Sequence, residues 1–171
     1  MKLLTGLKIE YWPVSEWPDG SKILVAEIKV GEGLPSKSFI TTPIIRELIS
    51  KANYAKGREF GEITLNYSLM SKTLKFIKYY PIPNIRGSPK QDFLGKGIAA
   101  MIEAKVEQKA RSVFPQIDKV VFLNPTKFRI EQLKNRGFSF WEIKQGVSGK
   151  DFTKSLREKL AKDLRVKRKL K

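Results

Sequence analysis

Two glycines flank a lysine at Gly95-Lys96-Gly97, directly before a long run of residues with helical spacing. The first N–H groups of a helix have no partner within it, and together with the helix dipole they favour an anion. Glycine has no side chain, so it leaves the backbone open to a bulky phosphate group. The spacing therefore predicts a phosphate cradle. The alternative is that these glycines only let a loop enter a helix.

The chain contains no cysteine and no histidine. This excludes disulfides, thiol nucleophiles, Ser-His-Asp relays and the usual zinc or haem sites, and it predicts no metal centre. An enzyme built from this sequence must use carboxylates, hydroxyl groups, lysine, ordered water and backbone N–H groups. The same composition, rich in Lys and Glu, is also typical of thermophile proteins.

Length and charge limit the class of protein. The 171 residues, of which 41% are hydrophobic, suit one domain with a sizeable core. The apolar runs are too short for a membrane span and the first residues lack the apolar region of a signal peptide, so we expect a cytoplasmic protein. The formal net charge is +17. A charge of this sign predicts a polyanionic partner, which is nucleic acid, an anionic membrane surface or a phosphate-rich cofactor.

Hydrophobic periodicity predicts an α/β or α+β fold, with one mixed sheet flanked by helices in a single domain over 1–149 and a basic amphipathic helix and tail over 150–171. Strands are expected over 7–12, 22–30, 61–70, 72–80, 118–123 and 138–143. Helices are expected over 43–57 with Thr42 as the cap and Gly57 as the end, over 98–113, and over 125–136 with Asn124 as the cap. The prolines at 81, 83 and 89 predict a long irregular loop.

The order of elements in the second half resembles the cofactor-binding half of the GNAT superfamily of N-acyltransferases. The resemblance covers about residues 73–143: a strand, a loop ending in Gly-Lys-Gly, a helix, a second strand, and a helix closing in Arg136-Gly137-Phe138. It implies two strands that splay apart, with pantetheine along one strand and pyrophosphate on the loop and first helical turn. It therefore implies acetyl-CoA as the cofactor and acyl transfer to an unidentified acceptor as the activity.

The resemblance also implies which residues bind the cofactor. They are Tyr79, Tyr80, Gln91, Leu94, Gly95, Lys96, Gly97, Ile98, Ala99 and Asn124. The sequence departs from the family at Asp92, where the family has Arg or Gln, and at Leu133, where the family has the tyrosine that protonates the departing thiolate. Direct transfer needs a base to take the amine proton. Glu27, within an apolar strand, and Glu62, at the start of the next strand, are the candidate catalytic residues.

The C-terminal segment gives an alternative function. Residues 150–171 hold ten Lys and Arg against three Asp and Glu, and Phe152, Leu156, Leu160 and Leu164 recur on one helical face. Its last residues are too polar to pack and are predicted to contact phosphates. The nucleic-acid-binding candidates are Arg165, Lys167, Arg168, Lys169 and Lys171. The alternative is a non-enzymatic protein that binds DNA or RNA on a GNAT-like or other mixed α/β scaffold.

Overall fold

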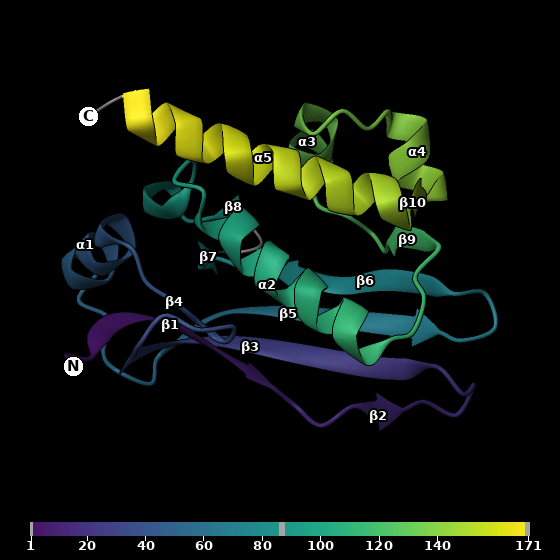
Figure 1. The fold of residues 1–171 in the computed structure, drawn as a ribbon, viewed down its shortest axis with the longest axis horizontal. Coiled ribbons are helices and arrows are strands. Elements are labelled where there is room, and N and C mark those ends of the chain that lie inside the picture. Colours follow the sequence, from purple (N-terminus) through teal and green to yellow (C-terminus); the bar gives the residue numbers. More distant parts are fainter. Residues whose placement is uncertain (1, 86–87, 170–171) are drawn as a thin grey trace.

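The computed structural model describes residues 2–85 and 88–169, and it has a central sheet with helices packed against it (Figure 1). The strands are β1 (Leu4–Tyr11), β2 (Ser15–Glu16), β3 (Lys22–Gly33), β4 (Phe39–Ile40), β5 (Glu59–Ser68), β6 (Thr73–Tyr80), β7 (Asn84–Ile85), β8 (Ser88–Pro89), β9 (Lys119–Phe122) and β10 (Val147–Ser148). The helices are α1 (Pro43–Lys51), the 3-10 turn η1 (Gln91–Phe93), α2 (Ile98–Val113), α3 (Lys127–Asn135), α4 (Phe140–Gln145) and α5 (Gly149–Lys169).

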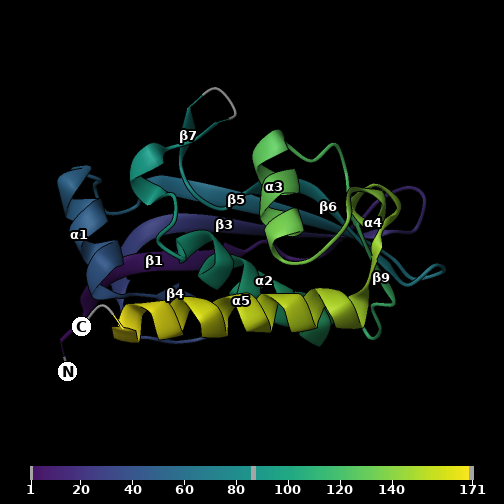
Figure 2. The same ribbon diagram turned by 90° about the horizontal axis from the view of Figure 1, so that it is seen from above.

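The main sheet has the strand order β10-β9-β6-β5-β3-β1-β4, with β2 paired to β3. Its central strands are antiparallel and follow the predicted alternation: Leu24, Ala26 and Ile28 are buried, whereas Glu27 and Lys29 on the other face are half-buried. Figures 1 and 2 show α2 and α5 packed along one face of the sheet. The expected mixed α/β class is therefore confirmed, as an open and mostly antiparallel sheet.

Strands β6 and β9 pair in parallel, from Thr73 opposite Lys119 to Phe76 opposite Phe122. Beyond this point β6 continues beside β5 alone. Leu65 of β5 lies opposite Phe76 and Thr64 opposite Lys78, so Ile77 is an extra residue on β6. Such a bulge bends the strand that carries it. Strand β6 thus separates from β9 at Ile77.

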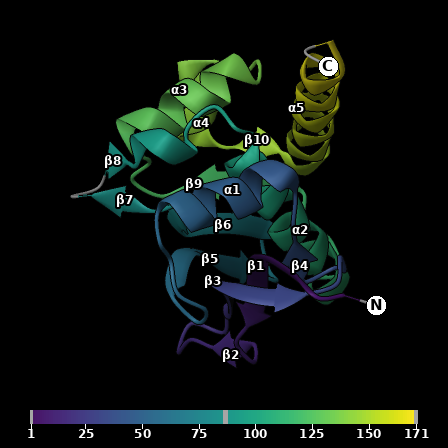
Figure 3. The same cartoon turned by 90° about the vertical axis from the view of Figure 1, so that its left-hand side faces the viewer.

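Helices α2 and α5 pack side by side and run in opposite directions. Gly97 at the start of α2 lies beside Asp163 of α5, and Thr153 near the start of α5 donates a hydrogen bond of 2.7 Å to Glu107 of α2. Phe152 of α5 is buried in the core. Figure 3 shows α5 beside α2, on the side away from the N-terminal strands. None of the helices in the described ranges is long and apolar enough to cross a bilayer.

At the C-terminal side of β9 the predicted helix over 125–136 is present as α3, but its predicted cap Asn124 is wrong, and so is the strand predicted over 138–143. Helix α3 begins at Lys127, and its cap is Thr126, whose Oγ1 accepts a hydrogen bond of 3.1 Å from the Arg129 N–H. Asn124 lies outside this helix with φ of 45°. Residues 140–145 form α4 rather than a strand, because Ser139 and Glu142 exchange the two hydrogen bonds of a capping box. This local signal outweighs the strand propensity of the aromatic residues.

Three smaller predictions also need correction. Helix α1 has the predicted Thr42 cap, but it ends at Lys51, so Gly57 does not terminate it. The proline-rich loop contains a short hairpin of β7 and β8. Pro89 is tolerated in it because the strand pairing needs no N–H from this position. Leu69, predicted as a strand residue, is 62% exposed and follows the end of β5.

Gly61 allows β5 to lie close to the end of β6. A Cβ at this position would stand 2.4 Å from the Tyr80 carbonyl oxygen. We therefore expect Gly61→Ala to reduce the free energy of unfolding by about 1 to 3 kcal/mol, measured by urea denaturation. Gly31→Ala is the matched control, because a Cβ there meets only the Lys8 Cβ at 3.7 Å. Equal losses in both variants would contradict this role of Gly61.

Candidate functional site

The separation of β6 from β9 leaves a pocket of about 30 Å³. Its lining comes from both strands and from the start of α3: Phe76, Ile77, Tyr79, Tyr80, Phe122, Leu123, Asn124, Pro125, Thr126 and Arg129. Three of the predicted cofactor residues, Tyr79, Tyr80 and Asn124, therefore meet here. Tyr80 is 40% exposed, so its side chain is open to an entering molecule.

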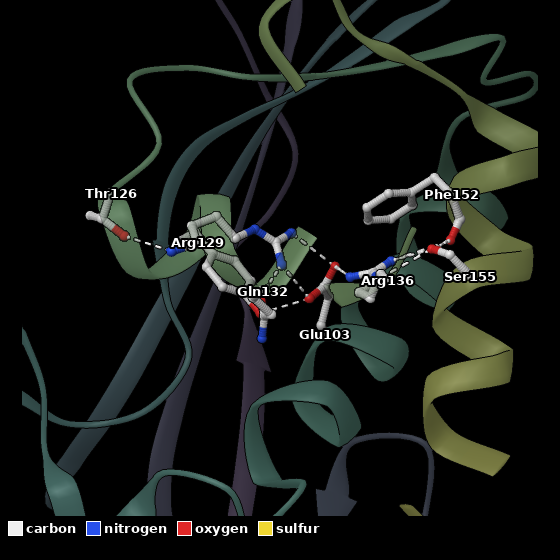
Figure 4. A network of polar contacts seen from close by, with 8 residues as sticks. Glu103, Thr126, Arg129, Gln132, Arg136, Phe152 and Ser155 are labelled. Carbon is white, nitrogen blue, oxygen red and sulfur yellow. Dashed lines mark hydrogen bonds and ion pairs between the residues drawn. The ribbon is translucent and has the colours of Figure 1, made fainter. Parts of the chain in front are cut away.

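One wall of the pocket is held by a buried network around Glu103 of α2 (Figure 4). Arg129 donates from Nη1 and Nη2 to the two Glu103 oxygens, each at 2.9 Å. Arg136 donates from Nη1 at 3.1 Å, and the Tyr79 hydroxyl donates at 2.6 Å. The Glu103 side chain is 1% exposed, and those of Arg129 and Arg136 are 2% exposed. Two cations thus share one carboxylate in the protein interior.

The ionisable groups of this network set each other's pKa values. Burial alone would raise the pKa of Glu103, but Arg129 and Arg136 outweigh burial and lower it from 4.5 to about 2. Burial alone would lower the pKa of Arg129, but the Glu103 carboxylate outweighs it and raises that pKa. Burial raises the pKa of Tyr79, so its hydroxyl stays protonated and remains a donor. At neutral pH Glu103 and Arg129 are therefore charged, whereas Tyr79 is neutral.

Arg129 has one guanidinium nitrogen that the network does not use. Its Nη1 serves Glu103 and Gln132, and its Nη2 serves Glu103. Its Nε is buried and has no hydrogen-bond partner among the described residues. A buried donor without an acceptor costs about 1 to 3 kcal/mol. Because the Arg129 side chain also lines the pocket, the pocket suits a molecule that brings an acceptor oxygen.

The Gly-Lys-Gly segment forms the start of α2 as predicted, with Gly97 as N-cap at φ of 75°. The backbone hydrogen bonds of the described residues leave the N–H groups of Gly95, Lys96, Gly97 and Ile98 without an acceptor. Gly95 has φ of 70° and open space where a side chain would be. The geometry at Gly95 thus fits an approaching anion.

A carboxylate of the same chain lies at this helix start. The Oδ2 atom of Asp163, on α5, is 3.3 Å from the position that a Cβ on Gly97 would take. This oxygen is buried and has no hydrogen-bond partner among the described residues, while Oδ1 accepts from Lys159 at 2.7 Å. A negative group is favourable at a helix N-terminus. Helix α5 therefore supplies an anion where the sequence predicts a phosphate.

The two predicted bases differ in their distance from the pocket across the sheet. Glu62 lies directly opposite Tyr80, and Glu27 lies opposite Glu62 on the next strand. Each pairs with a lysine, Glu62 with Lys78 at 3.8 Å and Glu27 with Lys29 at 3.4 Å. Glu62 is therefore the carboxylate adjacent to a pocket residue, and Glu27 is one strand further away.

The remaining predicted residues lie elsewhere. Gln91 is exposed in η1, Leu94 and Ala99 are half-buried around the start of α2, and Leu133 is fully buried in the core. The basic tail residues Arg165, Lys167, Arg168 and Lys169 are in the last turns of α5, where the structure describes the backbone only. Lys171 lies outside the described residues.

The sequence analysis predicted Tyr79 as a site residue but missed Glu103, Arg129 and the ion pair of Arg136. A signal was present, since Arg129 and Arg136 are seven residues apart and so share one face of the α3 region with the buried Leu133. Glu103 follows the apolar position Ile102 on α2, at the edge of the apolar stripe. Charged residues next to a buried stripe on two helices are candidates for a buried ion pair.

The comparisons with known proteins give no relative: no family model matches the chain, and no curated protein or solved structure matches it either.

The Glu103 network predicts a specific loss of stability in acid. A folded-state pKa of about 2 against an ordinary 4.5 means that ionised Glu103 stabilises the fold above about pH 4.5, and that this contribution is lost as the pH falls towards 2. The contribution is on the order of 3 kcal/mol. Glu103→Gln should remove this part of the pH dependence, as measured by urea unfolding at pH 6 and at pH 3.

At pH 7 the free energy of unfolding of Glu103→Gln should be about 3 to 5 kcal/mol lower than that of the wild type, because two buried guanidinium groups are left without their carboxylate. Glu131→Gln, which changes an exposed carboxylate on α3, is the control and should change stability little. A Glu103→Gln protein as stable as the control would show that the network contributes no stability.

Proposed function

We propose that the chain is an acetyl-CoA-binding N-acyltransferase of GNAT-like architecture. One observation carries the proposal: the parallel strands β6 and β9 separate at the Ile77 bulge, and the pocket at the separation is lined by a buried arginine with an unused N–H. Such a donor suits the oxygen of an acyl group, where negative charge develops when an amine attacks.

Different residues would bind the acyl end and the pyrophosphate end of the cofactor. Acetyl-CoA, when bound, supplies the acyl group as a thioester. Arg129 Nε would donate to the acyl oxygen, and the N–H groups of Gly95 to Ile98 would bind the pyrophosphate. The pocket of about 30 Å³ is small, and Asp163 stands beside the phosphate end. The negative charge of Asp163 therefore lowers the affinity for the pyrophosphate.

Two residues near the pocket supply the proton chemistry of the proposal. Glu62 takes the proton of the attacking amine, directly or through water, because it lies opposite Tyr80 at the pocket. The position of the family's tyrosine holds Leu133, which is buried and apolar. Tyr80 is the phenol placed to donate to the departing thiolate, since the Tyr79 hydroxyl already donates to Glu103.

The base is tested by comparing two carboxylates in the same row of the sheet. We expect Glu62→Gln to lower CoA release from acetyl-CoA by about 100-fold or more with a panel of amines, polyamines and basic peptides. Glu27→Gln is the matched control, one strand further from the pocket, and should retain wild-type activity. The reverse result would identify Glu27 as the base. No release from wild type, with CoA binding measured, would reject acyl transfer and leave a binding protein.

The phosphate end is tested by removing the competing carboxylate. Asp163→Asn should raise the affinity for CoA about 2- to 5-fold, measured by calorimetry, because a negative group leaves the helix start. Asp151→Asn removes the same charge from the first turn of α5 and should leave the affinity unchanged. An unchanged affinity in Asp163→Asn would mean that CoA does not use the start of α2.

A further inference from the structure

A second and larger hollow lies between the C-terminal half of α2 and the first turns of α5. It has a volume of about 630 Å³ and shares no lining residue with the β6–β9 pocket. Its floor is apolar but closed, because Leu74, Phe114, Val120 and Phe152 are each at most 3% exposed. Its margins carry the exposed cations Arg111, Lys150, Lys154 and Arg157. The margins of this groove therefore carry four positive charges above a closed apolar floor.

The three cations of α5 form one row. Lys150, Lys154 and Arg157 are spaced by four and three residues, so they lie on the same helical face over about two turns. None of the three takes part in an ion pair within the ranges that the structure describes. Placing like charges along one face is unfavourable for an isolated helix, and Glu158, four residues after Lys154, is one carboxylate against three cations.

The carboxylates at the groove do not neutralise this row. Glu107 is 6% exposed and is already bound to Arg111 at 2.7 Å and to the Thr153 hydroxyl at 2.7 Å. Glu158 is the other carboxylate in the lining. Lys150, Lys154 and Arg157 form no ion pair among the described residues, and Glu158 can balance only one of them. The groove therefore has an excess of positive charge.

We propose that this groove binds the phosphate backbone of nucleic acid. The charge calls for a polyanion, and the net charge of +17 on the whole chain brings one to the surface. A protein partner needs apolar anchors, and the four buried floor residues leave no open apolar pocket to receive one. A membrane surface is flat, whereas these cations border a recess.

The closed floor also limits how a nucleic acid is recognised. Phe114 and Phe152 are 3% and 1% exposed, so neither ring is open for a base to stack on it. Contacts from Arg and Lys to phosphates set position and affinity without reading sequence. The groove therefore binds nucleic acid independently of its sequence, and this role does not rest on acyl transfer.

The test measures how salt weakens binding to a fluorescent 20-base-pair DNA duplex. The groove variant combines Lys150→Gln, Lys154→Gln and Arg157→Gln. If the three side chains contact phosphates, the slope of log affinity against log salt should fall by about 2 to 3, equivalent to about a 40-fold smaller loss of affinity between 50 and 200 mM salt. The matched control combines Lys37→Gln, Lys56→Gln and Lys127→Gln, which are exposed lysines outside the groove, and should keep the wild-type slope.

The outcomes distinguish binding in the groove from binding driven by the overall positive charge of the protein. A wild-type slope in the groove variant, or an equal fall in the control, overturns the proposal. So does binding of poly-glutamate or of anionic phosphatidylserine vesicles through these three residues without binding of the duplex. Thermal unfolding checks that the groove variant folds. If it does not, Lys154→Glu alone replaces it, and its slope must fall by about 1 or more for the proposal to stand.

Discussion

Glu103 keeps a negative charge in a place that water does not reach. Moving a carboxylate and two guanidinium groups out of water is costly, and their attraction offsets the cost only when the geometry is good and further hydrogen bonds are made. Here the partners come from different parts of the chain: Tyr79 from β6, Arg129 from α3 and Arg136 from the turn after it. Arg136 extends the contact to α5 through the Ser155 hydroxyl. The positions of α2, α3, α5 and β6 therefore depend on one carboxylate.

This dependence joins the stability of the fold to the shape of the pocket. The guanidinium of Arg129 that holds Glu103 also lies 3.6 Å from the centre of the Tyr79 ring, and both side chains line the pocket. This wall of the pocket is thus part of the packed core, whereas residues 123–126 line the pocket from a loop. The bulge at Ile77 opens the sheet at the same level. A site of this kind holds an oxygen acceptor in one place, because the donor cannot turn away without breaking the ion pair.

Local signals in the sequence predicted the fold well where one face of an element is buried. The alternation of apolar and polar residues predicted β3, β5 and β6, and the capping residue Thr42 predicted the start of α1. Prediction failed where two local signals competed, as at Ser139, whose capping box made a helix from an aromatic segment. The candidate site was predicted only in part. Its bulge was hidden because Phe76 and Ile77 are both apolar, and the contacts of Glu103 join residues 26 and 33 positions apart, which no short pattern reveals.

Helix α5 is synthesised after the other elements of the described fold, since a protein leaves the ribosome from its N-terminus. Strands β1 to β10 and helix α2 precede α5 in the sequence. Until α5 has emerged, the Phe152 ring is missing from its place 5.6 Å from Phe76 and 5.9 Å from Phe122. In the same interval no carboxylate covers the start of α2. Completion of the core and closure of this helix end therefore both wait for α5.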